Sequence, residues 1–302
     1  VMEAVGVPRL VYTSTPSVVA TDGAIEGGDE SMPYGTHFFG ADYPRTKAAA
    51  ERLVLGADSA DLRTVALRPH MIWGPGDPHF LPRFVQRRRS GKLARIGPDD
   101  PLVDTVYVDN AAAAHVLALE RLSSGAPVHG RAYFITNDEP LGLWTMVDRL
   151  LAAAGEAPVD KTVPLSIARP AAWLIESAWR AFGLAGEPRL TRFLVHQVSA
   201  PHWFDVGAAK RDLGYTPAVS TEEGLRRVSA ALASGTVSGN VSITSSRRWW
   251  HASTRAARVS AGRAHVSGAS ADTGDSPARA AAASSIGSRA CSEGAAPLRV
   301  EI

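Results

Sequence analysis

Apolar residues along this chain recur in two patterns, short continuous runs and longer stretches with helical spacing. The short runs have the length and composition of buried strands, and they lie at residues 9–13, 64–67 and 130–137. The stretches with helical spacing lie at residues 44–55, 110–122 and 141–155. Strands that alternate with helices predict an α/β chain whose parallel sheet is covered by helices on both faces.

Three other parts of the chain depart from this alternation. Residues 16–40 are rich in Gly, Pro, Ser and Asp, which predicts a long loop. Residues 163–200 are apolar with helical spacing, which fits either helices packed on the sheet or a lid that faces lipid or an apolar substrate; we favour packing on the sheet. Residues 236–302 lack the apolar content that offsets chain entropy, so we predict a disordered tail.

The tail also contains two tryptophans beside two arginines, at Arg247–Trp250, which is compatible with a binding patch. Its Ser-, Ala-, Arg- and Gly-rich composition instead favours a non-native tail, such as a frame-shifted reading of a GC-rich coding sequence produces.

Composition and charge exclude several classes of protein. The net charge of +2 argues against a nucleic-acid binder, and residues 1–235 carry about −2 because the tail holds eight Arg against four acidic residues. The single cysteine, Cys291, leaves no disulfide framework and fits a reducing compartment such as the cytoplasm. No apolar run is long enough to predict a membrane span. His79 and His115 lack partners at metal-ligand spacing, so we predict no metal site.

A tyrosine and a lysine four residues apart stand at the start of the predicted helix 44–55. This spacing places Tyr43 and Lys47 on one helical face, where the ammonium group would favour the phenolate and lower the pKa of the tyrosine. The preceding strand ends in YTSTPS, whose hydroxyl groups belong to Thr13, Ser14, Thr15 and Ser17. A phenol, an ammonium group and a hydroxyl brought together can move a proton to or from an alcohol or carbonyl oxygen.

Six segments carry a family resemblance: RLVYTSTPSVV, DYPRTKAAAE, LRPHMIWGPGDP, VDTVYVDNAAAAHVLA, AYFITNDEP and LGYTPAVSTEEGL, in consistent order over roughly residues 1–233. Together they resemble the extended short-chain dehydrogenase/reductase family, most of all its 3β-hydroxysteroid dehydrogenase/isomerase branch in bacterial sterol-dehydrogenase form. The resemblance implies a Rossmann-type domain and NAD as cofactor, with NADP open. It implies oxidation of a 3β-hydroxyl of a sterol-like substrate to a ketone; a 3-oxo lipid reductase and a nucleotide-sugar enzyme stay open.

The resemblance also implies roles for individual residues. Tyr43 becomes the general acid/base, and Lys47 lowers its pKa and binds the nicotinamide ribose. Thr15 takes the position of the catalytic hydroxyl, with Ser14 as the near alternative. The backbone expected along the nicotinamide belongs to Pro69, His70, Met71 and Ile72. Positions that we assign to structure are Trp73 and Trp144 in the core, and Asp109 or Asn110 as a helix cap.

Taken with the resemblance, the composition changes divide the chain into three parts. Residues 1–162 are expected to form a partial dinucleotide-binding domain, the C-terminal part of a Rossmann-type sheet. Residues 163–235 are expected to form a helical substrate region with a closing helix from about Thr221, and residues 236–302 the tail. The apolar helical region favours a lipidic or sterol-like small molecule as substrate. The oligomeric state stays open, a homodimer included.

The chain departs from the family at the dinucleotide-binding turn. Family members carry a Gly-rich strand–turn–helix that sets the pyrophosphate on a helix N-terminus, and no G-x-G-x-x-G occurs in these 302 residues. The first residues have the pattern of a helix end followed by a strand rather than of a signal peptide. We therefore expect an N-terminally truncated form of a longer enzyme, and an inactive remnant is the alternative to an active oxidoreductase.

Overall fold

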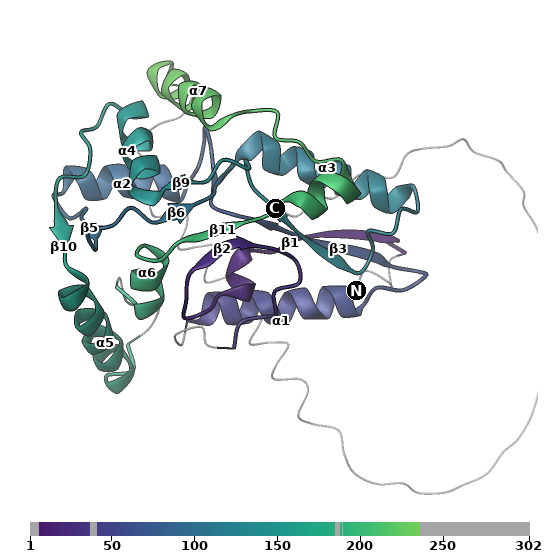
Figure 1. Ribbon diagram of the computed structural model, residues 1–302, viewed down its shortest axis with the longest axis horizontal. Helices are drawn as coiled ribbons and strands as arrows, with labels where there is room; N and C mark the ends of the chain where they lie inside the picture. The colour runs from purple at the N-terminus through teal and green to yellow at the C-terminus, as the bar shows by residue number, and fades with distance from the viewer. Residues whose placement is uncertain (1–5, 37–40, 185–187, 189, 236–302) are drawn as a thin grey trace, which may run out of the picture. The chain divides into compact units, whose positions relative to one another are not determined.

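The computed structural model describes residues 6–36, 41–184, 188 and 190–235 (Figure 1). The strands are β1 (Arg9–Thr13), β2 (Ile25–Gly28), β3 (Arg63–Pro69), β4 (Ile72–Trp73), β5 (Arg95–Ile96), β6 (Leu102–Val103), β7 (Val106–Tyr107), β8 (Arg131–Ile135), β9 (Leu141–Gly142), β10 (Thr162–Val163) and β11 (His202–Phe204). The helices are α1 (Asp42–Gly56), α2 (Phe80–Arg89), α3 (Val108–Ser123), α4 (Leu143–Ala153), α5 (Leu165–Ala181), α6 (Arg192–Gln197) and α7 (Thr221–Ala233), with short helical turns η2 (Pro16–Val19) and η3 (Ala209–Leu213).

A three-stranded parallel sheet in the order β1-β3-β8 forms the centre of the fold. Val11 of β1 pairs with Val65 of β3, and Leu67 of β3 pairs with Tyr133 of β8. Every residue of β3 after Arg63 is buried, whereas β1 has no fully buried residue. A continuous apolar run in the middle strand is typical of a parallel sheet that is covered on both faces. The predicted α/β class with a parallel sheet is therefore confirmed.

Helices α1 and α3 lie on opposite faces of this sheet (Figure 1). Leu67 packs in one hydrophobic cluster with Ala114 of α3, while the adjacent Arg68 reaches Glu51 of α1. Successive residues of a strand point to opposite faces, so this alternation in β3 assigns one helix to each face. The sheet thereby fixes the N-terminal end of α1 relative to the end of β1.

The predicted loop at residues 16–40 contains regular structure, which corrects the sequence interpretation. Pro16–Val19 form the turn η2, and Ile25–Gly28 form strand β2. Strand β2 pairs in parallel with β11 in a second, four-stranded sheet of order β2-β11-β6-β9. Because the pairing partner lies more than 170 residues away, the local Gly-rich composition gives no sign of the strand.

Trp73 and Trp144 both lie in one hydrophobic core, which also includes residues of α2, α4 and α7. Both tryptophans were predicted to be core residues. The indole of Trp73 packs edge-on against Tyr107, with ring centroids 5.4 Å apart. Helix α7 approaches this pair at Gly224, where an added Cβ would lie 2.7 Å from both rings. A glycine is therefore required for α7, which begins at the predicted Thr221, to close over the core.

Helix α5 is not a core helix, so the favoured prediction for this stretch is wrong for α5. It packs through two small residues, Ala168 and Ala172, in a cluster with Val195 of α6. Most of its large apolar side chains are exposed. The apolar periodicity was real, but it cannot distinguish a buried face from one that points away from the protein.

All described residues, from 6 to 235, fall within one compact unit. The boundary predicted at residues 162 and 163 runs within this unit, and that division stays a prediction. The predicted disordered tail, 236–302, lies outside the described residues. Among the helices that the structure does describe, none combines the length and apolar content needed to cross a bilayer.

Candidate active site

Thr13, the last residue of β1, and the residues Ser14, Thr15 and Ser17 after it carry four hydroxyl groups, and their surroundings differ. The Thr13 hydroxyl lies 2.8 Å from Nε2 of His115, whose Nδ1 lies 2.7 Å from the carbonyl oxygen of Ala111. Since Nδ1 must donate to that carbonyl, Nε2 accepts from Thr13. The Ser14 hydroxyl is buried and has no hydrogen-bond partner among the described residues. Neither hydroxyl is therefore paired with Tyr43.

Thr15 is the hydroxyl that meets the tyrosine. Its side chain interacts with the Tyr43 phenol and lowers the pKa of that phenol. The same Thr15 oxygen lies 3.2 Å from the Ser17 hydroxyl and accepts from the Ser17 N–H at 3.3 Å, which makes Thr15 the N-cap of η2. The local turn thus fixes the threonine rotamer while the hydroxyl reaches the phenol. The structure favours Thr15 over Ser14, the alternative that the sequence leaves open.

Helix α1 carries Tyr43 and Lys47 one turn apart near its N-terminal end. The Lys47 ammonium donates a 2.6 Å hydrogen bond to the Thr13 carbonyl oxygen and lies 4.6 Å from the centroid of the Tyr12 ring. One lysine thereby ties the first turns of α1 to the end of β1. This contact places the Lys47 ammonium against Thr13, two residues before Thr15, and Tyr43 lies one turn before Lys47 on α1.

The electrostatics of the pair differ from expectation in one respect. Burial raises the pKa of Tyr43 above its usual value, and the hydrogen bond with Thr15 opposes this rise. Tyr43 keeps 53% of its surface exposed, so solvent still weakens the effect of burial. Lys47 is not among the causes of this shift, so the lowering of the Tyr43 pKa by Lys47 that the sequence predicts stays a prediction.

A second tyrosine near Lys47 does not compete as the acid/base. Burial, followed by the charge of Glu51, raises the pKa of Tyr12 to about 12. Tyr12 therefore stays a neutral phenol at ordinary pH. Burial also lowers the pKa of Lys47, and the Glu51 carboxylate opposes that change. A nearby negative charge favours the ammonium form.

Glu51 is a site residue that the sequence analysis did not single out. It is fully buried one turn beyond Lys47 and accepts from Arg68 Nη2 at 2.6 Å and from the Tyr34 hydroxyl at 2.9 Å. Tyr43, Lys47 and Glu51 are spaced by four residues, so all three lie in one row of α1. That regular spacing is the signal that could have identified the carboxylate.

The segment Pro69–Ile72 runs from the last residue of the middle strand, β3, to the first residue of β4, at the same end of the sheet as Thr15. The Ser14 N–H donates to the Leu67 carbonyl at 2.6 Å, which joins the ends of β1 and β3. Met71 adopts φ 46°, a left-handed conformation that is rare for a residue with a side chain and is often found at functional sites. Pro69 is buried, and Ile72 begins β4.

His70 is buried within this segment and pairs with Asp104, which the sequence analysis also missed. The Nδ1 atom of His70 lies 2.5 Å from one Asp104 oxygen, and the other oxygen accepts from the Phe204 N–H at 2.7 Å. Asp104 thus connects the end of β3 to β11 of the second sheet. The pair has a structural role, as expected for His70, and it fixes the backbone from Pro69 to Ile72.

The helix cap predicted at Asp109 or Asn110 is wrong. The N-cap of α3 is Tyr107, whose side chain makes no capping bond. Asp109 lies in the first turn and pairs with Arg227 at 3.2 Å. Asn110 is buried, and its side chain accepts from the N–H groups of Ala218 and Val219 at 3.0 Å. Long-range partners override the local capping preference of these residues.

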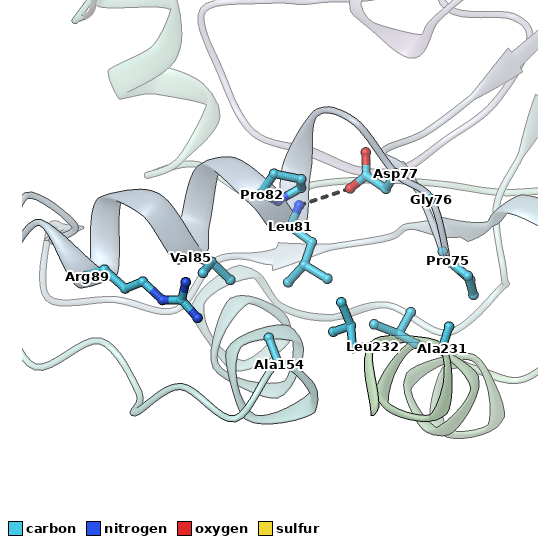
Figure 2. Close-up of a pocket in the computed structure, with 12 residues that line it drawn as sticks. Pro75, Gly76, Asp77, Leu81, Pro82, Val85, Arg89, Ala154, Ala231 and Leu232 are labelled. Carbon is cyan, nitrogen blue, oxygen red and sulfur yellow. Dashed lines mark hydrogen bonds between the residues drawn. The ribbon is translucent and has the colours of Figure 1, made fainter. Parts of the chain in front are cut away.

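A cavity of about 220 Å³ is separate from these residues. It lies between α2, α4 and α7 and is lined mainly by apolar side chains such as Leu81, Val85 and Leu232 (Figure 2). Its two charged side chains are already engaged: Asp77 accepts the Leu81 N–H at 2.9 Å, and Arg89 pairs with Glu156 at 2.6 Å. In the part of the chain that the structure describes, no group of three His, Cys, Asp or Glu side chains could hold a metal ion.

Comparison with known proteins identifies the family. Residues 2–166 match the model of the 3-beta hydroxysteroid dehydrogenase/isomerase family, which is more than half of the chain. The chain belongs to this family. A 2-alkyl-3-oxoalkanoate reductase from Stenotrophomonas maltophilia is 51% identical over 76% of this chain and 69% of its own length. A decarboxylating sterol-4-alpha-carboxylate 3-dehydrogenase from Saccharomyces cerevisiae is 38% identical over 76% of this chain and 67% of its own.

Among solved structures, gox2253 matches with a TM-score of 0.60 and 25% identity, over 77% of this chain and 68% of that one. The chain thus spans about two thirds of the length of each of these three proteins. The named relatives are oxidoreductases, and the Rossmann-like fold expected from the sequence is shared.

The described residues of this family member fit one end of a nicotinamide cofactor. Thr15, Tyr43 and Lys47 present a hydroxyl, a phenol and an ammonium group at the carboxyl ends of β1 and β3, where open parallel sheets bind ligands. The described residues contain no Gly-rich strand–turn–helix for the pyrophosphate. Within the described residues, the chemistry of these side chains thus suits the nicotinamide end of the cofactor and not its adenine end.

Proposed function

We propose that this protein is a nicotinamide-dependent oxidoreductase that interconverts a ketone and an alcohol, with Tyr43, Thr15 and Lys47 as its catalytic residues. The observation that carries the proposal is the hydrogen bond of the Lys47 ammonium to the Thr13 carbonyl, which ties the helix of Tyr43 to the strand that precedes Thr15, together with the interaction by which Thr15 lowers the pKa of Tyr43. Such a hydroxyl pair can hold one substrate oxygen between two donors, as acid–base catalysis requires.

The substrate class that best fits is a 3-oxo carboxylate with a large apolar body. The bacterial relative is named for a 2-alkyl-3-oxoalkanoate, and the yeast relative for a sterol 4-carboxylate that reacts at position 3. In both compounds the reacting carbon is next to the carbon that bears the carboxylate. The greater identity to the reductase, 51% against 38%, favours the 3-oxo lipid over the sterol that the sequence analysis put first.

Each residue has a distinct task in the proposed reduction. Thr15 and Tyr43 donate hydrogen bonds to the substrate carbonyl oxygen and polarise it. The nicotinamide, when bound, supplies the hydride to the carbonyl carbon. Tyr43 gives its proton to the oxygen, so the ketone becomes an alcohol, and the tyrosine regains a proton from water. Lys47 stabilises the phenolate in between, and is the group that would hold the cofactor ribose.

A second candidate function is the reverse reaction on a sterol. Oxidation of a 3β-hydroxyl next to a 4-carboxylate uses the same proton path in reverse, with Tyr43 as base. The sterol-4-alpha-carboxylate 3-dehydrogenase relative supports this candidate. Either reaction uses NAD or NADP. The described residues do not select between the two, because none of them would meet the adenosine ribose, where NAD and NADP differ.

The test measures loss of nicotinamide absorbance with the purified protein, NADH or NADPH and a 2-alkyl-3-oxoalkanoate of chain length about C12 to C16. We expect reduction of the free acid and much slower reduction of the matching 3-oxo methyl ester, which lacks the carboxylate. Turnover of a 4-carboxy-3β-hydroxysterol with the oxidised cofactor, but not of the 3-oxo acid, would select the second candidate. Equal rates with acid and ester would contradict the substrate class.

A further inference from the structure

Thr15 has a second hydroxyl beside it, that of Ser17, which the proposed mechanism does not use. The two side-chain oxygens lie 3.2 Å apart, and either of them can be the donor. The main-chain N–H of Ser17 also donates to the Thr15 oxygen, at 3.3 Å. Ser17 therefore approaches one oxygen of the proposed site with two groups, one from its backbone and one from its side chain.

The main-chain bond is sufficient for the local turn. Thr15 is the N-cap of η2 because its oxygen accepts the Ser17 N–H, which any residue except proline can supply. Within the described residues, the Ser17 hydroxyl makes its hydrogen bond to Thr15 alone. This second bond is additional to the cap, so the fold of η2 does not require it.

The turn that carries Ser17 packs against α1, the helix of the proposed catalytic tyrosine. Val18 and Val19 are buried in one hydrophobic cluster with Ala48 of α1. Ser17 is the one residue of η2 that is not fully buried. The two valines thus anchor the turn in the core, while the Ser17 hydroxyl lies beside Thr15.

The number of hydrogen bonds that a hydroxyl can make determines which oxygen donates during the reaction. A threonine hydroxyl has one proton and two acceptor sites. A substrate carbonyl oxygen has no proton, so Thr15 must give its own proton to it. The Ser17 N–H occupies one acceptor site of Thr15, and the other site is left for the Ser17 O–H. With substrate bound, Ser17 is therefore the donor and Thr15 the acceptor.

We propose that Ser17 is a positioning residue of the active site, whose hydroxyl turns the single proton of Thr15 toward the substrate carbonyl oxygen. The inference rests on the proposed function, in which Thr15 polarises that oxygen. Hydrogen bonds in a chain strengthen one another, so the bond from Ser17 makes Thr15 a better donor. The 3.2 Å separation is longer than usual for two hydroxyls, and we expect it to shorten when the carbonyl engages the Thr15 proton.

The first test is kinetic, with the 2-alkyl-3-oxoalkanoate as substrate. Ser17→Ala removes the hydroxyl and keeps the main-chain bond that caps η2. We expect kcat to fall by about 3- to 10-fold, the net contribution of one hydrogen bond, with KM little changed. Ser17→Thr keeps a hydroxyl and should recover most of the rate. The control is Ser31→Ala, which removes an exposed hydroxyl bonded to Asp29 and should behave as wild type.

A double substitution separates an effect through Thr15 from a general structural effect. If Ser17 acts through the Thr15 hydroxyl, Ser17→Ala has nothing to act on in Thr15→Val, so the double variant should be as active as Thr15→Val alone. Multiplied losses in the double variant would overturn the proposal, as would a wild-type rate of Ser17→Ala beside a slow Thr15→Val. Wild-type rates in both Thr15→Val and Tyr43→Phe would instead refute the proposed function.

A second measurement needs no turnover. In protein labelled with 3-fluorotyrosine, fluorine NMR follows the ionisation of the six phenols, and Tyr43→Phe identifies the Tyr43 signal. Thr15 lowers the pKa of Tyr43, so a weaker donor at Thr15 should raise that pKa. We expect a rise in Thr15→Val, a smaller rise in Ser17→Ala and none in Ser31→Ala. A raised Tyr43 pKa in Thr15→Val with an unchanged one in Ser17→Ala would overturn the proposal, whether or not the chain is active.

Discussion

The Lys47 ammonium donates a 2.6 Å hydrogen bond to the main-chain carbonyl of Thr13. This contact joins the first turns of α1 to the last residue of β1. Thr15 follows two residues later, and Tyr43 precedes Lys47 by one turn, so a single bond fixes the distance between the two hydroxyl groups of the proposed site. Lys47 thus positions α1 against β1 in addition to contributing a positive charge to the proposed site.

Removal of the Tyr43 hydroxyl should abolish most of the activity. The substitution Tyr43→Phe keeps the ring and removes the transferable proton, so we expect kcat to fall by about 10²-fold or more, the usual contribution of general acid–base catalysis. The rate is followed by absorbance of the reduced nicotinamide. The control is Tyr133→Phe. Tyr133 lies on β8, and its phenol donates to Asp212 at 3.0 Å. Near wild-type turnover of Tyr43→Phe would end the assignment.

The two neighbouring hydroxyls, Ser14 and Thr15, should differ sharply in their effect. Thr15→Val removes the hydroxyl that interacts with Tyr43, and we expect kcat/KM to fall by about 10²- to 10³-fold, the loss expected for one donor to a developing charge. Thr15→Ser keeps the hydroxyl and should recover most activity. Ser14→Ala should have little effect, because that hydroxyl is buried without a partner. Loss of activity in Ser14→Ala but not in Thr15→Val would reverse the assignment.

The sequence pattern predicted correctly those elements whose bounds depend on neighbouring residues in the chain. Strand β1 and the start of α7 at Thr221 agree with the predicted bounds, because an apolar run and a helix-start signal determine them. Strand β2 was predicted as loop, since it exists only by pairing with β11. The capping prediction for Asn110 failed for a related reason: its partners, Ala218 and Val219, come from a distant part of the chain.

The site shows the same division between local and long-range information. The spacing of Tyr43 and Lys47 is readable from sequence, and the resemblance added Thr15. The choice between Thr15 and Ser14 depends on rotamers set by η2, which no spacing reveals. The state of the Lys47 ammonium depends on the Thr13 carbonyl and on Glu51, a residue of α1 that is buried where it pairs with Arg68 of β3.

The pair of Glu51 and Arg68 should be necessary for stability. Both side chains are buried, and Glu51→Gln leaves the Arg68 guanidinium without its carboxylate, so we expect a loss of about 3–5 kcal/mol in the free energy of unfolding. Urea denaturation followed by circular dichroism measures the change. Asp42→Asn is the control, since it breaks an exposed pair with Arg45 and should cost about 1 kcal/mol or less.

A double substitution separates the charge from the packing of this pair. Glu51→Leu with Arg68→Met removes both charges and keeps apolar volume, so it should destabilise the fold less than Glu51→Gln alone. If Glu51→Gln cost no more than Asp42→Asn, the burial of the pair would not hold in solution.

His202 should make the fold sensitive to mild acid. Its ring is buried, its Nδ1 lies 2.9 Å from the Ala200 carbonyl oxygen, and its centroid lies 5.1 Å from that of His70. Burial, and next the charge of His70, lower the pKa of His202 from 6.5 to about 3. Below pH 6.5 the unfolded chain therefore binds a proton that the folded chain does not. Stability is full above this pH and falls as the pH drops toward 3.

The size of the effect follows from these two pKa values. Between pH 7.5 and pH 5.0, this single group should reduce the free energy of unfolding by about 2 kcal/mol, which urea denaturation at the two pH values can measure. His202→Asn keeps a donor for the Ala200 carbonyl and cannot take up the proton, so its pH dependence should be weaker by that amount. The exposed His79→Asn should retain the wild-type difference. If His202→Asn and wild type lost the same stability between the two pH values, His202 would not be buried as a neutral ring between β2 and β6.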